Sequence, residues 1–351
     1  MNRNLLLPVG AAVLLFLGTA LSFELPQKEF GRPEFLEIQG YLSTPFEAAS
    51  EYAYWGSRIK EAGGEVAYAE LKDAYRTADV SSQHFGAHVF GELLYEEKGM
   101  EGIAVCDDAF AFGCYHAFLV KAFLESTDAE ETIQTAVAAC GGNNAPYGRA
   151  CRHGIGHGLV AYFGYEEEKL NDILRFCPEA GSLYVFEGCP AGVFMEYYWR
   201  VEATQEGAAF TWRRFDPILP HNPCPGIEGG RRNVCYAQLP LWWDAVFYGD
   251  YGKIGALCGS VPDPTGQRSC FLGLGMFAAT RSEYESEATI EKCLSMPDQE
   301  AELLCRSGAF LSFLGYAGNK QEALPVCNGL LPEAREQCRN TQQSILYVQE
   351  T

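Results

Sequence analysis

The stretch Cys140-Gly141-Gly142-Asn143-Asn144-Ala145-Pro146-Tyr147-Gly148-Arg149-Ala150-Cys151 decides the fold of this chain. Its two cysteines enclose a loop rich in glycine, proline and asparagine, the residues that interrupt helices and form turns. An amphipathic segment, residues 130–137, precedes the first cysteine, and helical sequence follows the second. The stretch therefore predicts a helical hairpin whose loop carries one cysteine at each end.

The same pattern recurs along the chain. Fourteen cysteines form seven successive pairs, of which six enclose 10 or 11 residues and the first encloses 7. The first cysteines are spaced 34, 37, 47, 34, 35 and 34 residues apart, and such a period is typical of helical hairpin repeats. We predict an all-α fold, an α-solenoid of helical hairpins with a disulfide in each of seven repeats. The expected disulfides are Cys106–Cys114, Cys140–Cys151, Cys177–Cys189, Cys224–Cys235, Cys258–Cys270, Cys293–Cys305 and Cys327–Cys338.

Local disulfides compete with a second interpretation, in which the cysteines are metal thiolates. No CxxC motif occurs in the chain, which argues against a zinc ribbon, a thioredoxin motif and a haem attachment site. Closing a loop of about 12 residues removes roughly 2.8 kcal/mol of unfolded-state entropy on the chain-entropy estimate. Seven such bridges would contribute strongly to the stability of the fold.

Residues 1–22 have the composition of an export signal. Arg3 is the only charged residue before Glu24, and the apolar run between them is typical of a signal peptide. The uncharged run of 20 residues is also about as long as a membrane-spanning helix. A cleaved signal and a retained N-terminal anchor both stay open, and a chance apolar core helix is the third interpretation. The first two place the protein outside the cytoplasm, in the periplasm, secreted, or anchored facing outward.

The remaining chain divides into an N-terminal helical capping region, residues 23–100, and the repeats, residues 101–351. An irregular insertion at residues 201–223 is interpreted as a lid or a decorated loop. The last helix is expected over residues 333–348. The 46 acidic and 26 basic residues give a net charge of −20, which argues against nucleic-acid binding and favours cations.

Five of the six histidines lie between positions 84 and 157. His84 and His88 are four residues apart, as are His153 and His157, so each pair shares one face of a helix. Counted from the second cysteine of its unit, His116 occupies position two, and so does His153. An earlier unit beginning at position 82 would place His84 there too. Three adjacent helices are therefore expected to present histidines on one wall.

A histidine cluster of this kind points to a transition metal, because neutral imidazole is a common ligand of zinc, copper and iron. Glu92 continues the face of the first pair by one turn, and Glu196 lies on the next equivalent helix, so either carboxylate could complete a site. Zinc is the first expectation and copper the second, with iron or haem as further options. Whether the site is catalytic stays open, because the chain lacks HExxH and other catalytic motifs. The predicted ligands are His84, His88, His116, His153, His157, Glu196 and Glu92.

Two alternatives remain from the sequence. One is a metal-free interaction scaffold that offers a concave helical surface to a protein partner, with each histidine capping or packing separately. The other is a non-covalent haem or redox carrier. Gly154, Gly156 and Gly158, in one helical stretch, fit either close packing by a neighbouring helix or a bound group against the backbone. A membrane contact is expected only through the N-terminal anchor.

Three motifs carry a family resemblance: CYHxF at residues 114–118, CxHGxGHG at residues 151–158 and CxxGVFME at residues 189–196. Their combination resembles an uncharacterised set of exported bacterial and archaeal proteins over residues 82–198. The resemblance implies that these residues occur together, and it implies no reaction. The repeat architecture is also similar to tetratricopeptide-type hairpin arrays, although the signature side chains of those repeats are not evident.

Overall fold

The structure is a computed structural model that describes residues 45–141, 148–178, 182–204, 207–317, 320–342 and 347–349. The predicted signal or anchor, residues 1–22, lies outside the described residues. Within the described ranges, no helix combines the length and the apolar character needed to cross a membrane.

The chain folds as helical hairpins, so the predicted all-α class is confirmed. We call the helix that carries the second cysteine of each pair a B helix, and include the equivalent helix α4. The B helices are α4 (Val80–Lys98), α5 (Gly113–Leu124), α7 (Gly148–Phe163), α9 (Cys189–Tyr198), α10 (Arg231–Val246), α12 (Pro264–Arg281), α14 (Gln299–Ala317) and α16 (Pro332–Arg339). The other helices are α2 (Pro45–Ala62), α3 (Gly64–Ala74), η1 (Gly99–Val105), α6 (Ala129–Cys140), η2 (Glu167–Lys169), α8 (Leu170–Arg175), η3 (Cys224–Gly226), α11 (Tyr251–Gly259), α13 (Ser286–Leu294), α15 (Lys320–Ala323) and η4 (Leu324–Cys327).

All seven predicted disulfides are present, and all fourteen cysteines lie in the described ranges. Their Cα–Cα distances of 5.4 to 5.8 Å are those of ordinary disulfides. Each bridge ties the two helices of one hairpin together. Seven disulfides indicate an oxidising environment, as found outside the cytoplasm.

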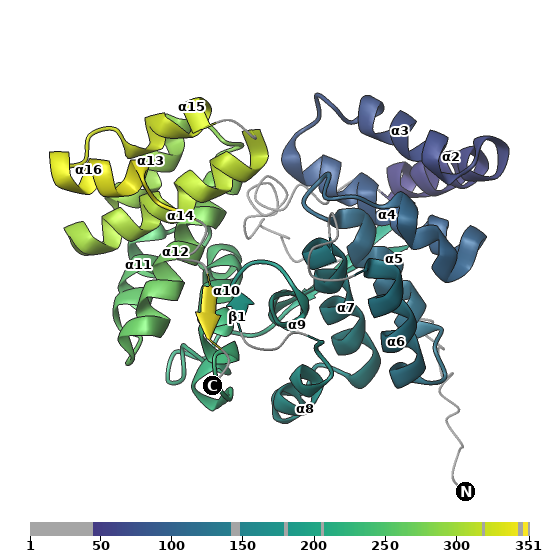
Figure 1. Ribbon diagram of the computed structural model, residues 1–351, viewed down its shortest axis with the longest axis horizontal. Coiled ribbons are helices and arrows are strands. Elements are labelled where there is room, and N and C mark those ends of the chain that lie inside the picture. The colour runs from purple at the N-terminus through teal and green to yellow at the C-terminus, as the bar shows by residue number, and fades with distance from the viewer. Residues whose placement is uncertain are drawn as a thin grey trace, which may run out of the picture.

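The B helices pack side by side in one row, which curves into an arc from α4 through α9 to α14 (Figure 1). In four of the seven units the third position after the second cysteine is glycine, and these glycines (Gly154, Gly192, Gly273 and Gly308) permit this close packing. A Cβ on Gly192 would lie only 1.9 Å from the carbonyl oxygen of His153. Likewise, a Cβ on Gly273 would lie 2.1 Å from the carbonyl oxygen of Ala237. Neighbouring B helices therefore approach until their backbones touch, and one continuous apolar core runs along the row.

Two non-local contacts join distant parts of the arc. The backbone N–H of Val80, at the start of α4, donates to Glu283 Oε2 at 3.0 Å, beyond the end of α12. Strand β1 (Ser182–Tyr184) pairs antiparallel with strand β4 (Tyr347–Gln349) near the C-terminus. The expected single helix over residues 333–348 is therefore wrong, because α16 ends at Arg339 and the chain returns as a strand.

The insertion starts as a β-hairpin and not as irregular chain, which corrects the expectation for its first part. Strand β2 (Trp199–Thr204) pairs antiparallel with strand β3 (Gly207–Trp212). The hairpin leaves the end of α9 and packs against α2 and α4. Because α5 and α7 lie between α9 and α4 in the row, the hairpin spans the part of the arc that carries the five clustered histidines.

Candidate metal centre

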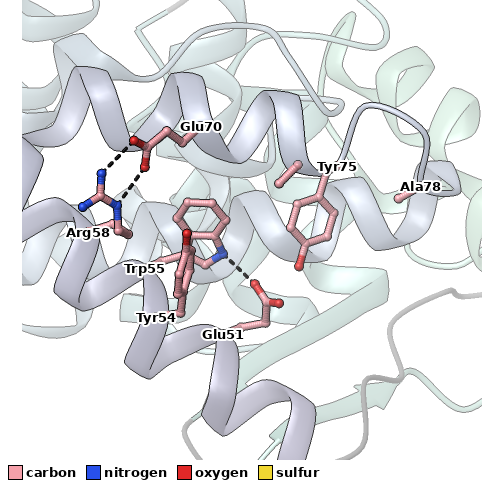
Figure 2. Close-up of a pocket in the computed structure, with 8 residues that line it drawn as sticks. Glu51, Tyr54, Trp55, Arg58, Glu70, Tyr75 and Ala78 are labelled. Carbon is pink, nitrogen blue, oxygen red and sulfur yellow. Dashed lines mark hydrogen bonds and ion pairs between the residues drawn. The ribbon is translucent and has the colours of Figure 1, made fainter.

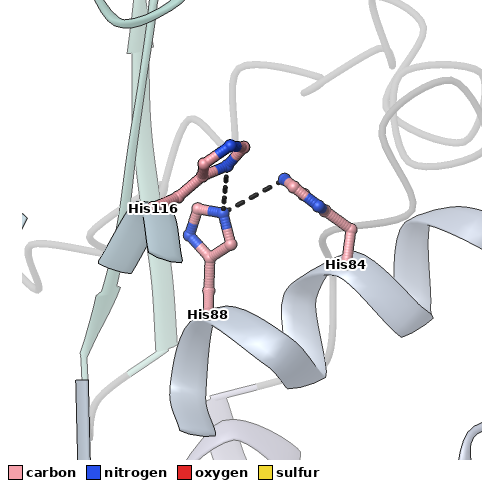
Figure 3. A group of neighbouring side chains, drawn as sticks. All are labelled: His84, His88 and His116. Carbon is pink, nitrogen blue, oxygen red and sulfur yellow. Dashed lines mark hydrogen bonds between the residues drawn. The ribbon is translucent and has the colours of Figure 1, made fainter. Parts of the chain in front are cut away.

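Helices α4 and α5 bring three histidines together (Figure 3). His88 Nε2 lies 3.1 Å from His84 Nε2 and 3.3 Å from His116 Nδ1. Zinc–nitrogen bonds of 2.0–2.1 Å in a tetrahedral site place two nitrogen ligands about 3.4 Å apart. The three ring nitrogens therefore have nearly the spacing that one bound ion requires.

His116 also belongs to a second group, with His153 and His157 of α7. One ring nitrogen from each of the three lies within 4.8 Å of the others, and all three side chains are buried. The rings of His116 and His157 are stacked, with centroids 4.3 Å apart. Among the described residues, no hydrogen-bond partner faces His116 Nε2, His157 Nε2 or either ring nitrogen of His153. Buried polar atoms are normally paired, so this second group has unused ligand capacity.

The local packing explains why the histidines meet. Positions two and six of a B helix face the same side. In α7, glycine at position three lets the preceding helix approach closely, and glycine at position five does the same for the following helix. A Cβ on Gly154 would lie 2.6 Å from the carbonyl oxygen of Tyr115, and one on Gly156 would lie 2.1 Å from that of Cys189. A Cβ on Gly158 would meet Phe123 at 2.2 Å. Of the two interpretations of these glycines, close packing by neighbouring helices accounts for all three.

The orientation of His84 is fixed by a backbone carbonyl. Its Nδ1–H donates to the carbonyl oxygen of Phe110 at 2.7 Å, which leaves a lone pair on Nε2, the atom that faces His88. Phe110, Ala111 and Phe112 have φ values of 55°, 51° and 66°, a left-handed conformation that costs non-glycine residues about 1 kcal/mol each. A strained turn thus presents the carbonyl that orients the ring, as backbone partners of metal-binding histidines do.

Glu196, on α9, orients the opposite end of the cluster. Its Oε2 accepts a hydrogen bond from His157 Nδ1 at 2.8 Å, and its Oε1 accepts one from the Tyr165 hydroxyl at 2.5 Å. His157 Nε2 is thereby left with the free lone pair. This carboxylate–histidine arrangement is typical of the outer shell of metal sites. Glu196 is predicted as a ligand, but the structure places its carboxylate behind His157 and outside both histidine groups.

Glu92 lies away from the histidines, on the same helix as His84 and His88. Its carboxylate accepts a hydrogen bond from the Tyr52 hydroxyl and lies 3.6 Å from the ammonium of Lys121. It belongs to neither histidine group. The structure therefore brings the five predicted histidines together and leaves the two predicted glutamates outside them.

Four of the five imidazoles of the cluster are held neutral by burial. Desolvation lowers the pKa of His84 to about 4 and lowers the pKa values of His88, His116 and His153 well below their ordinary value. Repulsion from neighbouring histidines adds to the effect. Neutral rings carry the lone pairs that metal binding needs, so the site is ready for a cation at neutral pH.

Two other features stand apart from this centre. The sixth histidine, His221, lies between β3 and η3, and its ring is bonded at 3.0 Å to the carbonyl oxygen of Leu257. A surface pocket with a volume of about 770 Å³ lies beside α2 and α3, and Figure 2 shows the residues that line it. Its polar groups pair with one another: Trp55 with Glu51 at 2.6 Å, and Arg58 with Glu70 through two nitrogens.

No protein-family model, curated protein or solved structure matches this chain. The site is therefore defined by its own geometry. Fold and site together describe a disulfide-linked helical repeat protein with a buried histidine cluster that could hold metal.

Proposed function

We propose that this protein is an extracytoplasmic metal-binding protein whose primary ion, zinc first and copper second, is held by His84, His88 and His116. One observation carries the proposal. Three neutral imidazoles from two adjacent helices meet at His88, whose Nε2 lies 3.1 Å from His84 Nε2 and 3.3 Å from His116 Nδ1. Borderline divalent ions such as Zn²⁺ and Cu²⁺ suit nitrogen ligands of this kind.

The histidines are held in place by rigid structure, which favours a metal-binding role over a chance clustering of side chains. The hairpin that delivers His116 is closed by the Cys106–Cys114 disulfide, and His84 is oriented by the Phe110 carbonyl. Pre-organised ligands lose little conformational entropy when the ion binds. The interaction scaffold, in contrast, requires histidines that are separate and individually hydrogen-bonded. The unpartnered, buried nitrogens of His116, His153 and His157 argue against it.

Three nitrogen ligands leave one position of a four-coordinate ion open. That arrangement is the one that catalytic zinc sites use, in which the ion lowers the pKa of a bound water molecule. His84 is the partly exposed member of its group, so solvent reaches the centre from its side. The proposed site is thus suited to activate water as well as to store an ion.

Metal content tests the proposal directly. The full chain, without a histidine tag, would be purified from an oxidising compartment and analysed by inductively coupled plasma mass spectrometry. We expect at least one equivalent of zinc or copper. His88→Ala should bind one equivalent fewer than the unmodified chain, whereas His221→Ala, the matched control outside the cluster, should bind the same amount. Circular dichroism should show the same helicity in both variants. Absence of metal even after reconstitution with zinc and copper would refute the function.

A further inference from the structure

We propose that the cluster is a dinuclear centre in which His116 bridges two divalent transition ions through its two ring nitrogens. The proposal rests on the proposed function, because it adds a second ion beside the first. The first ion binds His84, His88 and His116, and the second binds His116, His153 and His157.

The position of His116 in the row of helices supports the bridge. Helix α5 packs between α4 and α7, so His116 stands between the two histidine pairs and belongs to both groups. Its Nδ1 lies 3.3 Å from His88 Nε2. Its Nε2 is buried, and no partner for it is found in the part of the chain that the structure describes. A buried ring with one nitrogen beside the first group and a second nitrogen that is unpartnered has the form of a bridging ligand.

The second group also has what an ion needs. Both nitrogens of His153 and Nε2 of His157 are buried and unpartnered within the described chain. The remaining nitrogen of His157 donates to the buried carboxylate of Glu196, and a cation bound at Nε2 would balance that charge. No alternative use of these atoms is apparent in the described residues, whose three rings lie against each other at centroid distances of 4.3 to 5.0 Å.

The chemistry of a shared imidazole fixes how the second ion binds. A neutral ring has one lone pair and one N–H, so coordination at both nitrogens requires that the ring proton leave. The proton passes to solvent, and the resulting imidazolate uses one lone pair for each ion. Because the stacked rings of His116 and His157 must turn to face a common ion, we expect the second ion to bind more weakly than the first.

Copper loading of the full, untagged chain distinguishes the outcomes. Apoprotein would be titrated with Cu²⁺, its copper content measured, and its electron paramagnetic resonance spectrum recorded. An imidazolate bridge couples the spins of two Cu²⁺ ions, so the proposal expects two ions per chain and loss of the isolated-copper signal. The variant His153→Ala should bind one ion with an uncoupled spectrum. His221→Ala should behave as the unmodified chain, and His116→Ala should show no coupling at any loading.

Each other result has a definite meaning. Two ions with uncoupled spectra would overturn the bridge, and one ion per chain would overturn the second site while leaving the proposed function intact. No bound ion would overturn both. Retention of spin coupling in His116→Ala would show that another group bridges the ions, which also contradicts the proposal.

Discussion

Glu196 and Glu92 are both predicted from the sequence as metal ligands, yet their contacts in the structure differ. Glu196 accepts the Nδ1–H of His157, whereas Glu92 is bonded to Tyr52. We expect Glu196→Gln to lower the affinity of the His157 side of the cluster by about tenfold, because loss of an outer-shell carboxylate typically costs 10- to 100-fold. Competition with a chromophoric chelator would measure the affinity for each successive ion.

Glu92→Gln is the matched control for that experiment. It removes the same charge from a carboxylate that touches no histidine of the cluster, so both affinities should stay within about twofold. A tenfold loss in Glu92→Gln with none in Glu196→Gln would show that Glu92 is the ligand. That result would favour the ligand set expected from sequence over the contacts in the structure.

The positions of the histidines could be predicted from the sequence, but the hydrogen-bond partners of the two glutamates could not. The five histidines follow from the cysteine frame, because position two and position six recur with the period. The partner of a carboxylate depends instead on which neighbour its helix meets in space. Tyr165, which holds Glu196, lies after α7 in the chain and carried no motif, so its part in the site was missed.

Burial of neutral imidazoles predicts acid sensitivity of the metal-free protein. The pKa of His84 is lowered to about 4, and those of His88, His116 and His153 are lowered too, whereas an unfolded chain titrates near pH 6.5. The unfolded state then binds more protons, so the stabilising contribution is present above about pH 6.5 and is lost as the pH falls toward about 4.

Urea unfolding of apoprotein at several pH values checks this sign. The free energy of unfolding should fall between pH 6.5 and 4, by up to about 1.4 kcal/mol per pH unit for each proton taken up. The combined variant His84→Gln and His88→Gln should show a shallower fall. An unfolding free energy that rises on acidification through this range would contradict the burial of the neutral rings.

At the scale of helices, the position-three glycines set the spacing between neighbours. A Cβ on Gly192 would lie 1.9 Å from the carbonyl oxygen of His153, so Gly192→Ala must push α9 away from α7. We expect a loss of about 3 kcal/mol in stability, the upper range for overpacking, seen as a lower midpoint in thermal unfolding. Gly315→Ala in α14 is the control, because nothing lies within 4 Å of its added Cβ.

The control should move in the opposite direction. Alanine in place of an exposed helical glycine stabilises a protein by about 0.5–1 kcal/mol, so Gly315→Ala should raise the midpoint slightly. Equal midpoints for Gly192→Ala and the unmodified chain would show that the helices separate without cost. The close backbone packing would then not be what positions the histidines.

Helices and disulfides were predictable because their signals are local. Cysteine spacing and loop composition repeat within each unit, and every expected bridge formed. The strands were not predictable, since pairing of β1 with β4 joins residues 182–184 to residues 347–349. Three-residue strands carry no periodicity of their own, and only the arc of the whole chain brings them together. The hairpin β2–β3 was likewise expected as an irregular insertion.

At the scale of the whole molecule, a row of repeats couples mainly between neighbours. The histidines lie on α4, α5 and α7, so metal should slow amide hydrogen exchange there and leave α12 and α14 nearly unchanged. Hydrogen exchange with mass spectrometry, on apoprotein and zinc-loaded protein, measures this pattern. His88→Ala should lose the protection of α4, and His221→Ala should retain the whole pattern.

Two contacts between distant segments could spread the protection against hydrogen exchange beyond the histidine-bearing helices. Val80, at the start of α4, is bonded to Glu283, and strand β4 returns the C-terminus to β1. If metal protected α12 as strongly as α5, the arc would act as one cooperative unit and not as a row of neighbours. Glu283→Gln, which weakens the contact with Val80, would then confine the protection to the histidine-bearing helices. Protection that stays on those helices in the unmodified chain means instead that the metal centre stabilises only its own part of the repeat array.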